Sequence, residues 1–295
     1  MNLSGEVVKE VKASRSHTSC PLCDSTDLKA LWDTNGYAIS KCRNCSLVFV
    51  RNYVTTEELV AHYGAMNDDS YGDNNVDCLN YYYQALGGLI RKRFPKAGRV
   101  LDIGCSRGWF LDTMKDWECY GNEITSTYGQ AAREKHGDRI FIGPFEDYPI
   151  REGYFDVITL QDVFDHIREP LDVLAKCYKL LRPGGMIAIK VHNISCLYAK
   201  LTGKRFYAVM PPSHLFYYDK ATLARTLEKS GFQVVDSKFI GHLFRIKTIF
   251  LRLSRDNVKT PQFRVYQALK GTALGEFQFK KNLHDIITML AVKPS

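Results

Sequence analysis

The spacing of four cysteines near the N-terminus is typical of a metal site. Cys20 and Cys23 form one C-x2-C pair, and Cys42 and Cys45 form a second pair after eighteen intervening residues. Two sulfurs of such a pair converge on one side of a tight turn, and four thiolates complete a tetrahedral shell around zinc. A closed four-sulfur shell has no open position for substrate, so we predict a structural zinc ion. Pairing of redox thiols is the alternative, which this spacing disfavours.

A glycine-containing turn at residues 100–111 indicates a second kind of chemistry. An apolar strand reaches Asp102, crosses a turn with Gly104, Cys105 and Gly108, and enters an apolar helical pattern. Glycine lets the main chain approach a ligand closely, and a helix N-terminus offers unpaired N–H groups. The turn lacks the further glycine that brings main chain against a pyrophosphate in dinucleotide enzymes. It therefore predicts a site for a nucleoside without phosphates.

Further polar residues follow the next predicted strands. Glu123 ends the second strand of this region, where a carboxylate can accept both hydroxyls of a ribose. Phe145 and Glu146 follow the third strand and are predicted to flank the base, with Phe145 in the core as the alternative. Gln161 and Asp162 leave the fourth strand, where we expect them beside the reacting atoms.

The elements that must position these residues alternate between apolar runs and helical patterns. This alternation predicts an α/β fold with βαβ units and a parallel sheet. Strands are expected at 99–103, 119–123, 139–142, 155–160, 185–191, 232–240 and 285–292. Helices are expected at 80–94, 109–117, 126–136, 170–181 and 221–230. Ligands bind at the carboxyl ends of the strands in such sheets, which is where the candidate residues fall.

The N-terminal region has its own local signals. The Asn35-Gly36 pair predicts a short hairpin between the two cysteine pairs. Thr55 to Glu58 has the hydroxyl and acidic residues of a helix start. The polar residues 67–75 read as a linker or as a lid over the site.

Composition limits where the protein works and what it contacts. The chain has 295 residues, is 45% hydrophobic and carries a formal net charge of +8. Residues 241–295 hold ten Lys/Arg against three Asp/Glu, so the positive charge belongs to this segment. It predicts either an anionic partner or a solvated face. We expect no secretory signal and no membrane span, so nine cysteines indicate reduced thiols or metal ligands in the cytoplasm.

The motifs together resemble one family. The two cysteine pairs with Ser46-Leu47-Val48-Phe49, the turn at 100–108, the run at 155–167 and Leu181-Arg182-Pro183-Gly184-Gly185 resemble class I S-adenosylmethionine (SAM) methyltransferases with an N-terminal zinc module. Enzymes of this type are common in bacterial surface-glycan and secondary-metabolite pathways. The resemblance implies a Rossmann-like, seven-stranded, mostly parallel sheet preceded by a small zinc ribbon.

The resemblance also implies a division of the chain and an activity. Residues 1–17 are expected to be flexible, 18–52 to form the zinc module and 53–97 to form connecting or lid helices. Residues 98–295 are expected to form the SAM-dependent methyltransferase domain, with a basic insertion at 241–282 before the last strand. The implied reaction transfers methyl from SAM to a sugar or another small hydroxylated acceptor, free or linked to a nucleotide or lipid.

A hydroxyl acceptor must lose its proton as the new bond forms, so a base assists the transfer. His166 lies just past the fourth strand and is the first candidate, with Asp162 and Asp165 to orient it. His214, which follows a proline-stiffened loop, is the second candidate, and His192 at the end of the fifth strand is the third.

The sequence also bears on two alternative functions and on one surface. An RNA methyltransferase is disfavoured because residues 161–164 lack the Asn/Asp-Pro-Pro-aromatic turn of enzymes that methylate base amines. A non-catalytic SAM- or zinc-binding protein is disfavoured by the intact cofactor set. Cations interleaved with apolar residues at 244–255 predict either peripheral membrane contact or packing against the sheet.

Overall fold

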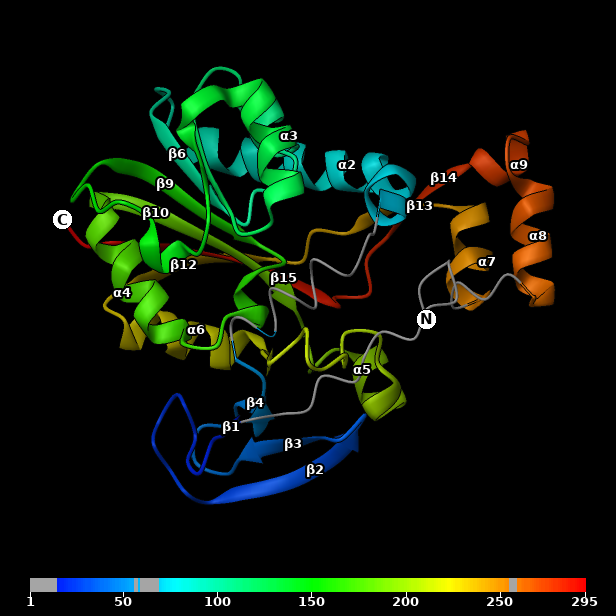
Figure 1. The fold of residues 1–295 in the computed structure, drawn as a ribbon, viewed down its shortest axis with the longest axis horizontal. Helices are drawn as coiled ribbons and strands as arrows, with labels where there is room; N and C mark the ends of the chain where they lie inside the picture. Colours follow the sequence, from blue (N-terminus) through cyan, green and yellow to red (C-terminus); the bar gives the residue numbers. More distant parts are fainter. Residues whose placement is uncertain (1–14, 56–57, 59–68, 255–258) are drawn as a thin grey trace.

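A seven-stranded sheet forms the centre of the computed structural model, which describes residues 15–55, 58, 69–254 and 259–295 (Figure 1). In spatial order its strands are β12 (Gln233–Lys238), β15 (Ile286–Val292), β10 (Leu181–His192), β9 (Phe155–Gln161), β6 (Arg99–Ile103), β7 (Glu118–Glu123) and β8 (Ile140–Ile142). Only β15 runs antiparallel to its neighbours within this sheet. The predicted mostly parallel sheet is confirmed.

Both faces of this sheet are buried, which explains why its strands are apolar without alternation. On β10, Met186 and Ala188 pack into one hydrophobic cluster, whereas Ile187 and Ile189 pack into the other. Figure 1 shows the helices α2 (Asp69–Arg93) and α3 (Ser126–His136) on one side, and α4 (Pro170–Leu180) and α6 (Lys220–Lys229) on the opposite side. The sheet lies between these two layers of helices.

Two predicted features of this region are wrong. The predicted helix at 109–117 contains only a short 3-10 helix, η1 (Leu111–Thr113). Its hydrogen bonds run from residue i to i+3, with Thr113 N to Phe110 O at 2.9 Å and Met114 N to Leu111 O at 3.0 Å. These tighter turns bury Phe110, Leu111 and Met114.

The polar stretch at 67–75 is not a loop where the structure describes it. From Asp69 onwards it forms the first turns of α2, so this helix begins well before the predicted residue 80. Acidic residues near a helix N-terminus are favoured by the helix dipole. The connecting or lid role expected of residues 53–97 stays a prediction. Residues 67 and 68 lie outside the described residues.

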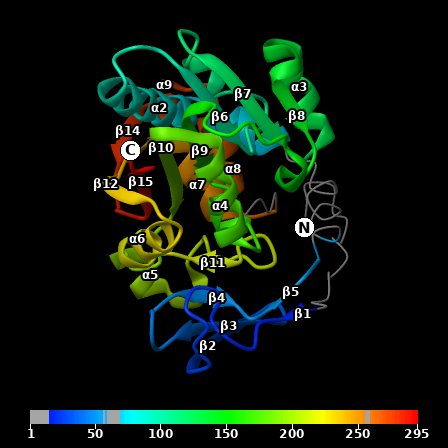
Figure 2. The ribbon, with the colours of Figure 1, turned by 90° about the vertical axis from the view of Figure 1, so that its left-hand side faces the viewer.

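The N-terminal module is a small antiparallel sheet. Its strands β2 (Leu28–Thr34), β3 (Tyr37–Cys42) and β4 (Val48–Val50) are joined by a fourth strand, β11 (Phe216–Tyr217), from the main domain. The hairpin at Asn35-Gly36 is confirmed, because both residues have positive φ angles of 55° and 78°. A further pair, β1 (Arg15–Ser16) and β5 (Asn52–Tyr53), flanks this sheet. Figure 2 shows the module below the main domain.

The segment predicted as an insertion forms a separate lobe at the right of Figure 1. It consists of β13 (His242–Arg245), α7 (Ile246–Ser254), α8 (Pro261–Leu269), α9 (Ala273–Glu276) and β14 (Gln278–Lys281), with β13 and β14 paired. Two of its cations are neutralised internally, since Lys247 and Arg245 both contact Glu276. Among the described residues, no helix has the length and apolar character needed to cross a bilayer.

The core of the module continues into the main domain. Phe49 of β4 is fully buried and belongs to the same hydrophobic cluster as Ile187 and Ile189 of β10. We therefore expect Phe49→Ala to lower the free energy of unfolding of the whole chain by about 3–5 kcal/mol, because it opens a cavity in a shared core.

Urea unfolding followed by fluorescence tests this expectation. The half-exposed Val235 on β12 supplies the control, and Val235→Ala should change stability by less than about 0.5 kcal/mol. A Phe49→Ala protein that keeps the wild-type main transition and gains a separate early one would contradict a shared core.

Candidate functional site

The turn after β6 is built for close approach of main chain. Gly104 and Gly108 have φ angles of +71° and +76°. A Cβ on Gly104 would lie 2.3 Å from Cγ2 of Val163, so no larger residue fits without rearrangement. The amides of Gly104 and Cys105 both donate to the carbonyl of Asn122, at 2.8 and 3.0 Å, which fixes the turn against β7.

Cys105 lies in the turn, but its side chain faces the sheet. Its sulfur packs where a Cβ of Gly121 would lie only 2.7 Å away, and the residue is buried. Because its amide is also used, Cys105 shapes the turn from behind. Its predicted cofactor contact is not tested by this geometry.

Asp102, next to the last residue of β6, is a buried carboxylate, and no cationic side chain among the described residues pairs with it. Its Oδ1 accepts hydrogen bonds from Thr159 Oγ1 at 2.5 Å and Gln161 Nε2 at 3.2 Å. Burial raises the pKa of Asp102 to about 7. Such a carboxylate gains most from a bound cation, and this fits the ammonium group of an amino-acid ligand.

Glu123 sits where the sequence predicts a ribose partner and also braces the turn. Its Oε2 accepts the amide of Ser106 at 2.8 Å, and its Oε1 accepts the amide and hydroxyl of Thr125 at 2.9 and 2.6 Å. A carboxylate offers about four acceptor sites, so these three hydrogen bonds leave room for one more, such as that from a ribose hydroxyl.

Phe145 and Glu146 lie on the 3-10 helix η3 (Phe145–Asp147). Phe145 is buried in the main hydrophobic cluster, which is the alternative that the sequence left open. Glu146 is exposed, and Lys176 Nζ holds the carbonyls of both residues at 2.8 and 2.7 Å. Their predicted contact with a base stays a prediction.

Gln161 and Asp162 extend from the end of β9 with unused acceptors. Gln161 Oε1 and Asp162 Oδ1 are buried and have no hydrogen-bond partner. Asp162 adopts φ +56°, and its Oδ2 pairs with Lys190 at 2.5 Å. Each of these two residues thus has one buried acceptor without a partner, which indicates that a ligand with donors or positive charge completes this site.

Lys190 is a functional candidate that the sequence analysis missed. Its side chain is only 2% exposed, and its ammonium lies 4.3 Å from the ring centroid of Tyr82. Burial would raise the pKa of Asp162, but the Lys190 charge outweighs this effect and lowers it. The sequence did contain a signal for this residue, since Lys190 is a lysine within the apolar run of β10.

Three histidines from different segments surround the buried carboxylate of Asp165. Asp165 and His166 belong to the 3-10 helix η4 (Phe164–His166), His192 ends β10, and His214 precedes β11. Asp165 Oδ2 lies 3.1 Å from His192 Nδ1, whereas Oδ1 lies 3.7 Å from His166 Nε2. The ring of His214 is 4.5 Å from that of His166 and 5.0 Å from that of His192.

The titratable groups of this cluster shift one another's pKa values. Burial would raise the pKa of Asp165, but the imidazoles of His166, His192 and His214 outweigh it and hold that pKa below its usual range. Burial lowers the pKa of His166 and takes that of His214 to about 4. The pKa of His192 is raised, because its hydrogen bond to Asp165 outweighs the effect of burial.

The structure thus brings all three candidate bases together around Asp165. Asp162 directly follows β9, three residues before Asp165. Tyr207 adds a ring 5.4 Å from His192, and its hydroxyl donates to Asp285 at 2.9 Å. Sequence reasoning did not include Tyr207, because no local pattern distinguishes it from packing aromatics.

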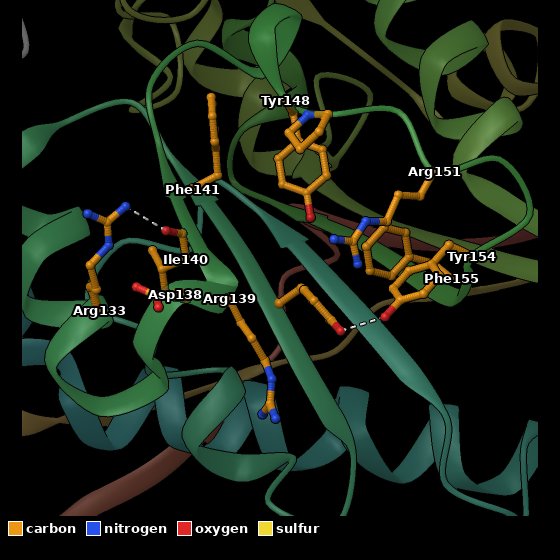
Figure 3. A pocket seen from close by; sticks show the side chains of 11 residues that line it. Arg133, Asp138, Arg139, Ile140, Phe141, Tyr148, Arg151, Tyr154 and Phe155 are labelled. Atoms are coloured by element: carbon orange, nitrogen blue, oxygen red, sulfur yellow. Dashed lines mark hydrogen bonds between the residues drawn. The ribbon is translucent and has the colours of Figure 1, made fainter.

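A separate pocket of about 180 Å³ lies at the other ends of the strands (Figure 3). It is lined by residues near the starts of β8 and β9, including Arg139, Ile140, Tyr148, Arg151 and Tyr154. None of the predicted site residues lines it. We therefore place the chemistry at the carboxyl ends, where the orphaned acceptors and the histidines lie.

The four N-terminal cysteines converge as predicted. Cys20 Sγ lies 3.4 Å from Cys45 Sγ, and Cys23 Sγ lies 3.5 Å from Cys42 Sγ. All four sulfurs lie within 4.8 Å of one another, as ligands of one ion would. The amide of Cys45 points at Cys42 Sγ at 3.4 Å.

Comparison with protein families decides the affiliation. Residues 79–237 match the family described as "Methyltransferase domain", which is more than half of the chain. The chain belongs to this methyltransferase family. With the glycine turn, Asp102 and Glu123 in place, it is a SAM-dependent methyltransferase of the class I fold.

Relatives identified by sequence agree with this assignment. The methyltransferase is 26% identical over 160 residues to a ubiquinone biosynthesis O-methyltransferase of Burkholderia pseudomallei, covering 49% of this chain and 68% of that protein. A second such enzyme, from Thiobacillus denitrificans, is 27% identical over 183 residues, with coverage of 57% and 78%.

Two solved structures share the fold. A candidate methyltransferase from Bacillus halodurans gives a TM-score of 0.53 at 18% identity, covering 72% of this chain and 99% of that one. The 1,6-didemethyltoxoflavin-N1-methyltransferase of Burkholderia thailandensis, solved with S-adenosylhomocysteine, also gives 0.53, at 14% identity and with coverage of 90% and 100%.

The glycine turn supplies a first test. We expect Gly104→Ala to weaken S-adenosylhomocysteine binding by the methyltransferase at least about tenfold, because the new Cβ meets Val163 and the residue must keep a positive φ. Isothermal calorimetry measures the affinity. Gly88→Ala is the matched control, since a Cβ there meets nothing within 4 Å on α2, and unchanged affinity in Gly104→Ala would remove the turn from the site.

The raised pKa of Asp102 supplies a second test. Below its pKa of about 7 the carboxyl is protonated and cannot balance an ammonium group. We expect affinity for S-adenosylhomocysteine to rise roughly tenfold between pH 6 and pH 8, since a bound cation favours the ionised form. Asp102→Asn should bind weakly with a flat profile. A wild-type profile that is flat, or that falls as pH rises, would contradict this role.

Proposed function

We propose that this methyltransferase transfers the methyl group of SAM to a hydroxyl oxygen of a small acceptor, such as a sugar or glycan precursor. That the chain is a SAM-dependent enzyme acting on small molecules agrees with its family and relatives. The class of acceptor is the proposal. The observation that carries it is the cluster of imidazoles around Asp165, because a hydroxyl needs a proton acceptor where an amine does not.

The atoms of the cofactor region fit SAM. The buried Asp102 carboxylate lacks a cation, and two neighbouring acceptors have no partner. SAM supplies an electrophilic methyl group on a sulfonium. The chain's part is to hold the amino-acid end at Asp102, the ribose at Glu123 and the reacting region beside Gln161 and Asp162.

The geometry favours His192 as the base, in place of His166, which the sequence ranked first. Asp165 Oδ2 lies 3.1 Å from His192 Nδ1, a hydrogen bond that orients the ring and leaves Nε2 to accept a proton. His166 lies 3.7 Å from the other oxygen, which is too long for a hydrogen bond. Asp165 therefore acts as a positioning residue, and His192 takes the hydroxyl proton.

We also propose that the four N-terminal cysteines hold a structural zinc ion. Their sulfurs are close enough to share one ion, and the four-sulfur set leaves no position for substrate. Its support to the site runs through β4 and β11. Phe49 pairs with Phe216, Val50 N donates to Leu215 O at 2.8 Å, and Leu215 N donates to Asp165 O at 2.9 Å.

Replacing His192 tests the proposed function. We expect His192→Ala to lower kcat for methyl transfer about 10²–10⁴-fold without changing the affinity for S-adenosylhomocysteine, because the base acts only on the acceptor. Transfer of labelled methyl to free, nucleotide-linked and lipid-linked sugars measures kcat, and calorimetry measures the affinity.

His242→Ala, on β13 outside the cluster, is the control and should keep wild-type kcat. The proposal would be overturned if the wild-type enzyme transferred methyl to amines or RNA and to no hydroxylated acceptor. Full activity of His192→Ala would remove this residue as the base.

A further inference from the structure

The Asp165 cluster contains more ligating atoms than a base needs. Asp165, His166 and His214 each offer one atom, and these three atoms lie within 4.8 Å of one another. Atoms bound to one ion through bonds of about 2.0–2.2 Å lie roughly 3–4 Å apart. Small rotations of three side chains would therefore bring them onto a single ion.

Asp165 Oδ1 is the first sign that a ligand belongs there. This atom is buried and has no hydrogen-bond partner, although its twin Oδ2 bonds to His192. Its separation of 3.7 Å from His166 Nε2 is too long for a hydrogen bond but suits two atoms that share an ion. A buried carboxylate oxygen without a partner is costly unless something cationic reaches it.

The orientation of His214 is the second sign. Its Nδ1 lies 2.7 Å from the carbonyl oxygen of Ala208. A carbonyl can only accept, so Nδ1 carries the proton and Nε2 keeps its lone pair. Metal-binding histidines are oriented in this way, with the second ring nitrogen donating to a carbonyl or carboxylate.

We propose that Asp165, His166 and His214 bind a divalent transition-metal ion that coordinates the acceptor hydroxyl. Two imidazoles and one carboxylate suit zinc, cobalt, manganese or iron, whereas magnesium and calcium prefer oxygen ligands alone. Three protein ligands leave coordination positions open, unlike the four-cysteine site. The part of the chain that the structure describes thus offers one closed and one open set of metal ligands.

This role rests on the proposed function, and it completes the proton transfer there. The ion lowers the pKa of the coordinated hydroxyl, whose proton passes to His192 Nε2. The oxygen forms the new bond to the methyl carbon, and the electron pair of the broken C–S bond stays on sulfur. Asp165 serves both partners, through Oδ1 to the ion and through Oδ2 to His192.

Metal stoichiometry tests the site without depending on turnover. The full-length protein is titrated with Co²⁺, and bound cobalt is measured by elemental analysis and absorption. We expect two equivalents in the wild type, one with the intense thiolate-to-cobalt bands of the cysteine site and one with weak nitrogen–oxygen bands. Cys42→Ser should lose the thiolate bands and keep the second equivalent.

His166→Ala and His214→Ala should each reduce affinity for the second cobalt at least about 100-fold while keeping the thiolate bands. Asp165→Asn should do the same. If it fails to fold, the histidine variants carry the test. His242→Ala is again the matched control and should keep two equivalents. Unchanged S-adenosylhomocysteine affinity in the histidine variants shows that the fold is intact.

The outcomes separate the two proposals. A single equivalent with thiolate bands in the wild type, or a second equivalent that survives in both histidine variants, overturns the metal site. Methyl transfer to hydroxyls in that case leaves the proposed function standing. Two equivalents without transfer to any hydroxylated acceptor overturn the proposed function and the catalytic role of the ion.

Discussion

The rest of the site depends on one buried carboxylate. Asp165 is 2% exposed, and its carboxylate is held by a hydrogen bond with His192, while the rings of His166 and His214 pack beside it. His166 lies on η4, His192 ends β10 and His214 precedes β11, so three segments that are distant in the sequence meet at one buried carboxylate. Charge balance in a buried place is more demanding than packing, because an unpaired charge costs far more than a small void.

The same residue connects the site to the N-terminal module. The carbonyl of Asp165 accepts a hydrogen bond from the amide of Leu215, and the carbonyl of Leu215 accepts one from the amide of Val50 on β4. The strand β4 lies shortly after the second cysteine pair. The module is therefore not a separate appendage: its sheet is completed by a strand of the main domain, and its core is continuous with the core under the sheet. This series of hydrogen bonds ends at the segment that carries His214.

Local signals predicted much of this molecule. The strand Arg99–Ile103 and the helix Ser126–His136 have the predicted bounds, because patterns of neighbouring residues determine where these elements begin and end. The 3-10 turns at 111–113 and the strand Phe216–Tyr217 were missed, since packing and pairing with distant segments decide them. For the same reason the sequence identified all three histidines as candidates but ranked His192 last: only the fold shows which of them Asp165 holds.

The measurement that tests the central claim most directly is a crystal structure with S-adenosylhomocysteine and an acceptor analogue bound. The account predicts the ribose at Glu123, the amino group at Asp102 and the sulfur facing the Asp165 cluster across Gln161 and Asp162. Binding of the nucleoside at the opposite strand ends, around Tyr148 and Tyr154, or a cofactor whose sulfur faces away from the three histidines, would contradict it.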